Sequence, residues 1–234
     1  ATQDGVGYFQ RAIHKGRRMS AARAFLHPAA NRKNLQVITQ AHATRILFEE
    51  RTAVGIEYDQ GGTRKQVRAR KEVILSGGVV ASAQLLQLSG IGDPDHLGRI
   101  GIEVRHALPG VGRNLRDHYA VRMVARVENT WTINQKARGL PLVGEIAKYF
   151  TGQPSILGLC PSLVHCFWKS HDAVQGNDLQ MTFTPASYKE GVQSQLDDFP
   201  GVTCAPWQQR PESSGWLLAR SADPFEAPEI QPNY

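Results

Sequence analysis

Two glycines between an apolar run and a helix give the sequence its strongest chemical signal. The run VILSGG occupies residues 73–78 and leads into residues 82–88, where Leu85 and Leu88 share one side of a predicted helix. Proteins of the α/β class use such a strand–glycine–helix joint to bring backbone amides close to a nucleotide. Glycine suits the joint because a Cβ would block the approach and the turn can require a positive φ. The alternative is a joint that only packs tightly.

A complete pyrophosphate-binding loop is not found beside this joint. Gly-x-Gly occurs at residues 5–7, 90–92 and 110–112, but Gln10, Asp95 and Leu115 stand where a third glycine would complete Gly-x-Gly-x-x-Gly. None of the three follows a predicted strand and opens a long helix. We therefore interpret all three as turns.

A metal site is the other chemistry that residue types suggest. Cys160, His165, Cys166 and His171 offer two sulfur and two nitrogen ligands, as tetrahedral zinc requires. On a strand, however, residues 160 and 166 face one side while residues 165 and 171 face the other. The spacing therefore favours core cysteines and a rim histidine, and we predict no metal site.

The elements that would position these residues follow from hydrophobic periodicity. Alternation predicts a β-meander over residues 35–75, with strands at 35–38, 44–49, 53–58 and 66–75 and a hairpin turn at Gly61-Gly62. Ser20 is a suitable cap for a short helix at residues 21–27 that Pro28 would stop. Further helices are expected at 82–88, from 93 or 94 to 99, and at 140–150, and further strands at 119–127, 159–168, 179–185, 201–208 and 216–221. Two lobes joined near residue 128 are the simplest arrangement.

Charge is concentrated at the N-terminal end of the chain. The 234 residues carry a formal net charge of +6, with 41% hydrophobic residues as in ordinary globular proteins. Residues 1–33 hold seven basic residues and one acid, and so account for the whole net charge. This basic segment could contact a phosphate-bearing ligand, or could be a solvated face or a surface that meets an acidic part of a longer protein. Nucleic acid is not expected, because the interleaved aromatic pattern of single-strand binding is missing.

Compartment and membrane contact are also constrained by composition. Three cysteines, Cys160, Cys166 and Cys204, are few and odd in number, which favours a reducing compartment. Residues 73–92 carry no charge and are long enough to span a bilayer, but glycine and polar residues interrupt them throughout. Residues 1–7 have no signal-peptide core. We therefore expect a cytoplasmic protein without a membrane span.

Four blocks, in the right order, resemble the glucose–methanol–choline oxidoreductase family. Residues 78–92, GVVASAQLLQLSGIG, resemble the family's second signature, with Ala83 where proline is usual. Residues 109–118, PGVGRNLRDH, resemble its next block almost residue for residue, and residues 16–26 its arginine-and-serine helix start. The last block is formed by residues 220–224 and 228–234, which resemble the end of the substrate-domain sheet.

The resemblance implies a fold, a cofactor and a reaction. The fold would be α/β (α+β), with part of an FAD/NAD(P)-binding lobe at residues 1–128 and part of an antiparallel-sheet substrate lobe at residues 129–234. The cofactor would be FAD, accepting a hydride from a small-molecule alcohol to give an aldehyde or ketone. Carried over by position, Ala43 would meet the adenine through its backbone, and Ser76, Gly77 and Gly78 would form the turn near the adenosine. The loop at residues 114–118 would lie near the flavin, with His118 as a hydrogen-bonded loop histidine.

Two departures limit what the chain is expected to do. The family's C-terminal histidine and its His or Asn partner, which take the hydroxyl proton, would lie beyond Tyr234. The sequence is therefore interpreted as an internal fragment, inactive by itself, that needs the remaining parts of its polypeptide. The strand at residues 159–168 lacks the acidic residue of choline-specific members, which argues against a quaternary ammonium substrate. The alternative function is a non-catalytic binding or interaction module with a degenerate flavoenzyme fold.

Overall fold

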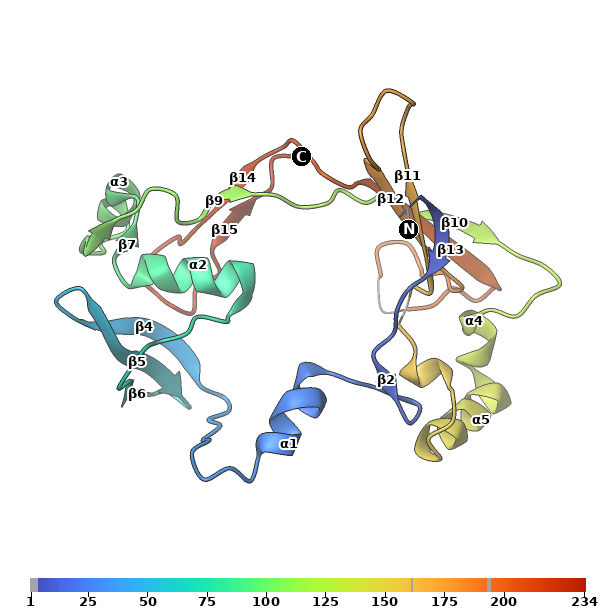
Figure 1. The fold of residues 1–234 in the computed structure, drawn as a ribbon, viewed down its shortest axis with the longest axis horizontal. Helices are drawn as coiled ribbons and strands as arrows, with labels where there is room; N and C mark the ends of the chain where they lie inside the picture. Colours follow the sequence, from blue (N-terminus) through green and yellow to red (C-terminus); the bar gives the residue numbers. More distant parts are fainter. Residues whose placement is uncertain (1–3, 161, 193–194) are drawn as a thin grey trace. The chain divides into compact units, whose positions relative to one another are not determined.

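The chain forms two compact units, each made from two segments. The computed structural model describes residues 4–160, 162–192 and 195–234. Unit 1 contains the described residues up to Leu35 together with His118–Arg210, and unit 2 contains Gln36–Asp117 and Pro211–Tyr234. The backbone passes from one unit to the other near residues 35, 117 and 210 (Figure 1), whereas the sequence predicted one join near residue 128. Antiparallel sheets and helices are both present, which confirms the mixed α/β class.

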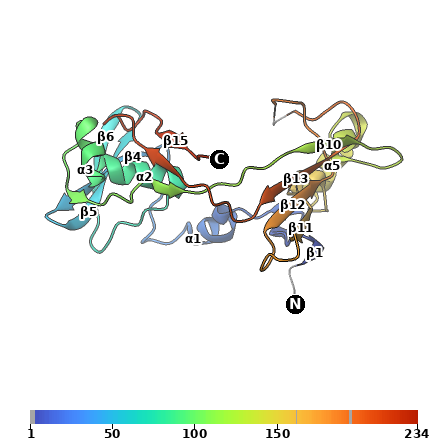
Figure 2. The same cartoon turned by 90° about the horizontal axis from the view of Figure 1, so that it is seen from above.

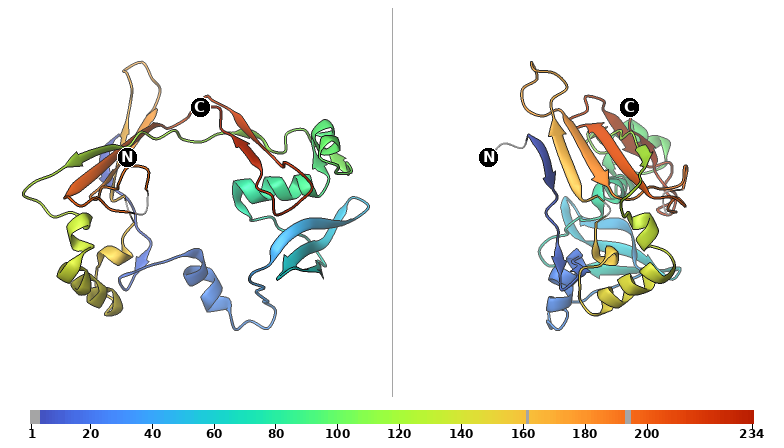
Figure 3. Two further views of the ribbon diagram at one scale, coloured as in Figure 1. Left: turned by 180° about the vertical axis from the view of Figure 1, so that it is seen from behind. Right: turned by 90° about the vertical axis from the view of Figure 1, so that its right-hand side faces the viewer.

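Unit 1 is built on a five-stranded antiparallel sheet, seen in Figure 3. Its strand order is β1-β11-β12-β13-β10, with β1 Gly5–Tyr8, β10 Met123–Arg126, β11 Val164–Trp168, β12 Leu179–Thr184 and β13 Gly201–Gln208. The interpretation of residues 5–7 as a turn is wrong, because Gly7 pairs with His165 in the ladder. A partner so far along the chain leaves no local signal in the sequence.

The ladder gives the two faces of this sheet different chemistry. Directly opposed residues share a face, so one face carries the row Gly7, His165, Thr182 and Ala205 and beside it Phe167, Gln180 and Trp207. The other face is largely apolar and carries Val6, Cys166, Met181, Phe183 and Cys204. Cys166 and His165 therefore point to opposite faces, as the zinc spacing argument expected. Within the described ranges, no group of three or more His, Cys, Asp or Glu side chains could hold a metal ion.

Short helices complete unit 1. A π-helix at Ala22–Leu26 continues into α1 (His27–Ala29), so the expectation that Pro28 stops the helix is wrong. Pro28 occupies the first turn of α1, where its missing N–H and fixed φ cause no loss. The other elements are the short strands β2 (Ile13–His14) and β3 (Arg17–Arg18), the helices α4 (Ile133–Lys136) and α5 (Gly139–Phe150), and a 3-10 turn at Ile156–Gly158.

Unit 2 contains the expected meander, shortened at both ends. Strands β4 (His42–Glu49), β5 (Thr52–Gln60) and β6 (Thr63–Arg68) pair in that order around the Gly61-Gly62 turn. The strand expected at residues 35–38 is wrong, since these residues are not in a strand. Residues 73–75 are likewise outside any strand, although an apolar strand was expected there. Apolar character alone does not make a strand, because a strand also needs a neighbour to bond its backbone.

Helix α2 (Gly78–Leu88) organises the rest of unit 2 (Figure 2). It is followed by β7 (Ile91–Gly92), α3 (Pro94–Arg99) and β8 (His106–Ala107), and then by a three-stranded sheet of β15 (Glu229–Gln231), β14 (Gly215–Leu218) and β9 (Arg113–Leu115). Ser89 ties the helix end to the meander, accepting from Ile46 N at 2.9 Å. Gln87 ties it to β14, donating to Leu217 O at 3.0 Å and accepting from Ala219 N at 2.7 Å.

Candidate functional site

A pocket of about 300 Å³ in unit 2 lies between the meander and α2. Three of the four residues that the sequence assigned to the cofactor line it, namely Ala43, Ser76 and Gly77. Gly78 is the first residue of α2 and directly follows this lining. Ile56, Leu75 and Leu85 give the pocket an apolar side. Segments more than 30 residues apart in the sequence thus meet at one hollow.

The two glycines of the joint serve different purposes. Gly78 has a φ of +79°, so it needs the left-handed freedom that only glycine has without strain. A Cβ built on Gly78 would meet no atom within 4 Å, so the space in front of it is open. A Cβ on Gly77 would lie 3.2 Å from the Ala81 Cβ, which is tight contact with the helix itself. Gly77 therefore shows the tight packing that the alternative interpretation named, and Gly78 shows the positive φ that the turn can require.

The N-terminus of α2 borders this pocket without a cap. Among the described residues, no side chain makes a capping hydrogen bond at Gly77, and the first turn contains no acidic residue. The first backbone N–H groups of a helix lack partners within the helix and carry its positive dipole end. The pocket therefore offers amide donors and a positive potential beside an apolar wall, an arrangement that suits an adenosine and its phosphates.

The rim of the pocket includes a histidine that sequence reasoning did not single out. His42 Nε2 donates to Pro224 O at 2.9 Å, and its ring stacks on Phe225 at 4.8 Å between centroids. These partners lie 182 residues away, so no local pattern could have revealed them. On the neighbouring strand, burial raises the pKa of Glu57, but hydrogen bonds from Thr44 and Arg45 more than offset it and hold the pKa below its ordinary value.

The polar face of the sheet in unit 1 carries buried groups without partners. His165 Nδ1, Trp207 Nε1 and Gln209 Oε1 are buried and make no hydrogen bond with any residue that the structure describes. The His165 ring lies between Phe9 and Phe167, at 4.9 and 5.1 Å between centroids. An unbonded buried polar atom costs free energy, so several on one face call for an explanation. A ligand that bonds to them is one such explanation.

His118 lies next to this face, in the block that the sequence analysis highlighted. Its Nε2 donates to Gln209 O at 2.9 Å, and its ring stacks on Trp207 at 5.6 Å. The neighbouring Asp117 belongs to unit 2, where its carboxylate accepts from the Tyr234 hydroxyl. The loop at residues 114–118 therefore makes specific contacts in both units.

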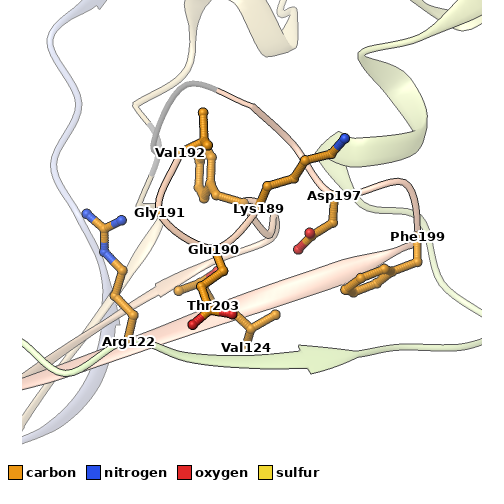
Figure 4. Close-up of a pocket in the computed structure, with 10 residues that line it drawn as sticks. Arg122, Val124, Lys189, Glu190, Gly191, Val192, Asp197, Phe199 and Thr203 are labelled. Atoms are coloured by element: carbon orange, nitrogen blue, oxygen red, sulfur yellow. The ribbon is translucent and has the colours of Figure 1, made fainter.

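A hollow of about 570 Å³ in unit 1 lies at the β10 edge of the sheet (Figure 4). Val124 and Thr203 form part of its wall from the sheet, and a loop brings Lys189, Glu190 and Asp197 over it. Arg126 lies over the ring of Phe199, another lining residue, at 4.5 Å. Both signs of charge line this hollow, and no residue that the sequence assigned to a site is among them.

Comparison with known proteins identifies the family. The family model described as GMC oxidoreductase matches residues 1–120. Over 99% of its length the chain is 40% identical to the mitochondrial choline dehydrogenase of Homo sapiens, covering 39% of that protein. Over its whole length it is 37% identical to an alcohol dehydrogenase [acceptor] of Pseudomonas putida, covering 43% of that protein. The chain therefore spans about two fifths of the length of these curated relatives.

Solved structures share the fold. A formate oxidase matches 99% of the chain and 45% of its own length, with a TM-score of 0.86 at 24% identity. Pyridoxine 4-oxidase from Mesorbium loti matches 99% of the chain and 42% of its own length, with a TM-score of 0.78 at 22% identity. At such identities the likeness concerns the fold alone. The family model covers more than half of the 234 residues and confirms the resemblance of the four sequence blocks. The chain therefore belongs to the GMC oxidoreductase family, a family of FAD-dependent enzymes.

Proposed function

We propose that the protein containing this chain is an FAD-dependent oxidoreductase that acts on the CH–OH group of an alcohol and yields an aldehyde or ketone. FAD, when bound, supplies the hydride acceptor. The observation that carries the proposal for this chain is the unit 2 pocket, which brings Ala43, Ser76 and Gly77 to the uncapped start of α2. Its volume of about 300 Å³ lies at the lower end of the range of small-molecule sites.

In this proposal unit 2 holds the adenosine end of FAD. The backbone of Ala43 contacts the adenine, while Leu85 and Ile56 exclude water from its face. Ser76, Gly77 and Gly78 turn the chain so that the first amides of α2 point to the adjoining phosphate. The open space in front of Gly78 fits this role, because a side chain there would fill it.

The polar sheet face of unit 1 is the surface that we assign to the alcohol. The Trp207 Nε1 atom is a donor only, so it suits a hydroxyl or carbonyl oxygen of the substrate. The absence of an acid at residues 159–168 supports an uncharged alcohol over choline, although several relatives are named as choline dehydrogenases.

Flavin binding by the chain tests the cofactor assignment. We expect the purified chain, of 25.8 kDa, to bind ADP and FAD in isothermal titration, and Ala43→Phe to weaken both by about tenfold or more because it fills the pocket. Val67→Phe is the matched control, since Val67 is an exposed residue of the same meander outside the pocket. Equal affinities for the two variants would refute the adenosine site.

Alcohol turnover by the full-length protein separates the two functions. An FAD-dependent alcohol oxidoreductase bleaches its bound flavin when a primary alcohol is added without oxygen. A protein that binds FAD and keeps its absorbance under a panel of alcohols would instead be the non-catalytic binding module. A cytoplasmic location remains part of the proposal because the cysteines are few and odd in number, although two relatives are named as mitochondrial. Among the described residues, no helix combines the length and apolarity that crossing a bilayer requires.

A further inference from the structure

A hollow of about 730 Å³ in unit 1 is walled by basic side chains. The β2–β3 hairpin contributes His14, Lys15 and Arg17. The helical segment that follows contributes Arg23 and His27, and no carboxylate is among the lining residues. Met19, Phe150, Thr151 and Gly152 complete the wall. We call this hollow the basic pocket.

The cations of the basic pocket are not neutralised by neighbouring acids. Ion pairs found in the described part of unit 1 involve Arg138, Lys148 and Lys189, and none involves a residue of the basic pocket. Arg17 lies over the Tyr149 ring at 5.4 Å, and this contact orients its guanidinium but does not neutralise its positive charge. The C-terminal end of α5 offers only the partial charge of its carbonyls. Gathering like charges without counter-charges disfavours the folded state, so an anion would stabilise this site.

The hairpin that carries two of these cations, Lys15 and Arg17, is held in place. Lys15 and Gly16 both have positive φ, 47° and 69°, as the tight turn requires. A Cβ on Gly16 would lie 2.6 Å from Gln153 O, so the turn is pressed against the residues that follow α5. On the other side, Met19 N donates to Ala12 O at 2.9 Å, and Arg23 N donates to Ser20 Oγ at 3.3 Å. Positions fixed in this way lose little entropy when a ligand binds.

We propose that the basic pocket binds a small molecule that bears a phosphate or pyrophosphate group. Arg17 and Arg23 can each present paired N–H donors to phosphate oxygens, and Lys15 adds a mobile positive charge. Phe150, 71% exposed, lies at the rim where it can cover an apolar part of the ligand. The site goes beyond the proposed adenosine site, because the basic pocket lies in unit 1 and shares no residue with the unit 2 pocket.

Isothermal titration of the chain with inorganic pyrophosphate tests this assignment. We expect binding that weakens with added salt, and a loss of at least about tenfold in affinity for the double variant Arg17→Gln/Arg23→Gln, since charged hydrogen bonds are removed. Arg32→Gln/Lys33→Gln is the matched control, because it removes the same charge from the same segment outside the pocket. Arg17→Lys/Arg23→Lys keeps both charges but loses the paired N–H donors, so its affinity should fall between those of the unchanged chain and the Gln variant. An unchanged melting temperature of the Gln variant shows that its loss of affinity does not come from misfolding.

Three outcomes would overturn the proposal. One is the absence of pyrophosphate binding at millimolar concentration, and another is an equal loss in the pocket variant and its matched control. The third concerns a chain that fails to bind free pyrophosphate. If such a chain sediments with phosphatidic acid vesicles but not with phosphatidylcholine vesicles, the ligand is a lipid surface. Ala43→Phe should leave pyrophosphate affinity unchanged, so failure of the adenosine site is distinguished from failure of this one.

Discussion

The Gln87 amide in unit 2 and the polar sheet face of unit 1 differ in how well their buried atoms are hydrogen-bonded. In unit 2, Gln87 is 1% exposed, and both ends of its amide are bonded to the backbone of the strand beside it. In unit 1, the sheet face bearing His165 and Trp207 leaves buried nitrogen atoms without partners. A satisfied buried amide stabilises one packing arrangement, whereas unsatisfied atoms weaken the fold unless something binds them. The contrast separates residues that hold the chain together from residues available for a ligand.

Removing the Gln87 amide is the change with the largest expected effect on stability. Gln87→Leu leaves the Leu217 carbonyl and the Ala219 N–H buried without partners, so we expect the free energy of unfolding to fall by about 3 kcal/mol. Urea denaturation measures it. Gln84→Leu, which loses one exposed bond to Glu226 O, should cost less than about 1 kcal/mol. Similar losses in both variants would show that Gln87 is no more important than a surface residue.

Unit 1 also contains a buried side-chain amide whose atoms are hydrogen-bonded. It tests whether the contrast between bonded and unbonded buried groups lies between residues rather than between units. Asn134 is 2% exposed and bonds to Ser187 N, Ser187 O and Asp197 O. We expect Asn134→Leu to cost about 2 kcal/mol and to expose residues near Asp197 to limited proteolysis. Asn177→Leu, at a residue whose Oδ1 has no partner, should cost clearly less. The reverse order would contradict the rule that satisfied groups carry the stability.

The opposite behaviour is expected at His165. His165→Phe removes an unbonded buried nitrogen and keeps a ring between Phe9 and Phe167, so the free energy of unfolding should change by less than about 1 kcal/mol. In the full-length protein the same change should raise the KM for the alcohol. Steady-state kinetics and thermal melting measure the two effects. A large loss of stability with unchanged KM would make His165 a structural residue.

Lowering the pH is expected to reduce the stability of the two units in different pH ranges. Burial lowers the pKa of His96 in unit 2 below 6.5, so the folded state resists protonation and stability falls as pH drops below about 6.5. In unit 1, hydrogen bonds from Lys148 and from Ile156 N hold the pKa of Glu145 below 4.5, so its contribution is present above that pH and lost as pH falls further. Hydrogen exchange of the Leu97 and Ile156 amides reports on the stability of unit 2 and unit 1, respectively. His96→Gln should abolish only the loss of stability in unit 2, and Glu145→Gln only the loss in unit 1. Loss of stability in both units over the same pH range would contradict the assignment of these two residues.

Much of the fold could be predicted where structure is local. Alternating residues gave β4 and β5, the 3.6-residue period gave α2 and α5, and Asp93 before Pro94 gave the start of α3. The errors fall where a distant partner decides, as for β1 at residues 5–7, or where an apolar run lies without a paired neighbour, as at residues 73–75. Pro28 was misread because a proline that ends one helical segment can equally begin the next.

The sequence by itself determined the family, because four blocks in order are a property of the chain alone and need no contacts to be recognised. The resemblance also assigned Ala43, Ser76 and Gly77 to the same cofactor, but only the tertiary structure brought them to one pocket. The stacking of His42 on Phe225, the unbonded atoms of His165 and Trp207, and the convergence of Arg17 with Phe150 at the basic pocket were likewise decided by folding. Each depends on segments far apart in the chain, whose approach is set by packing and hydrogen bonding rather than by local residue pattern.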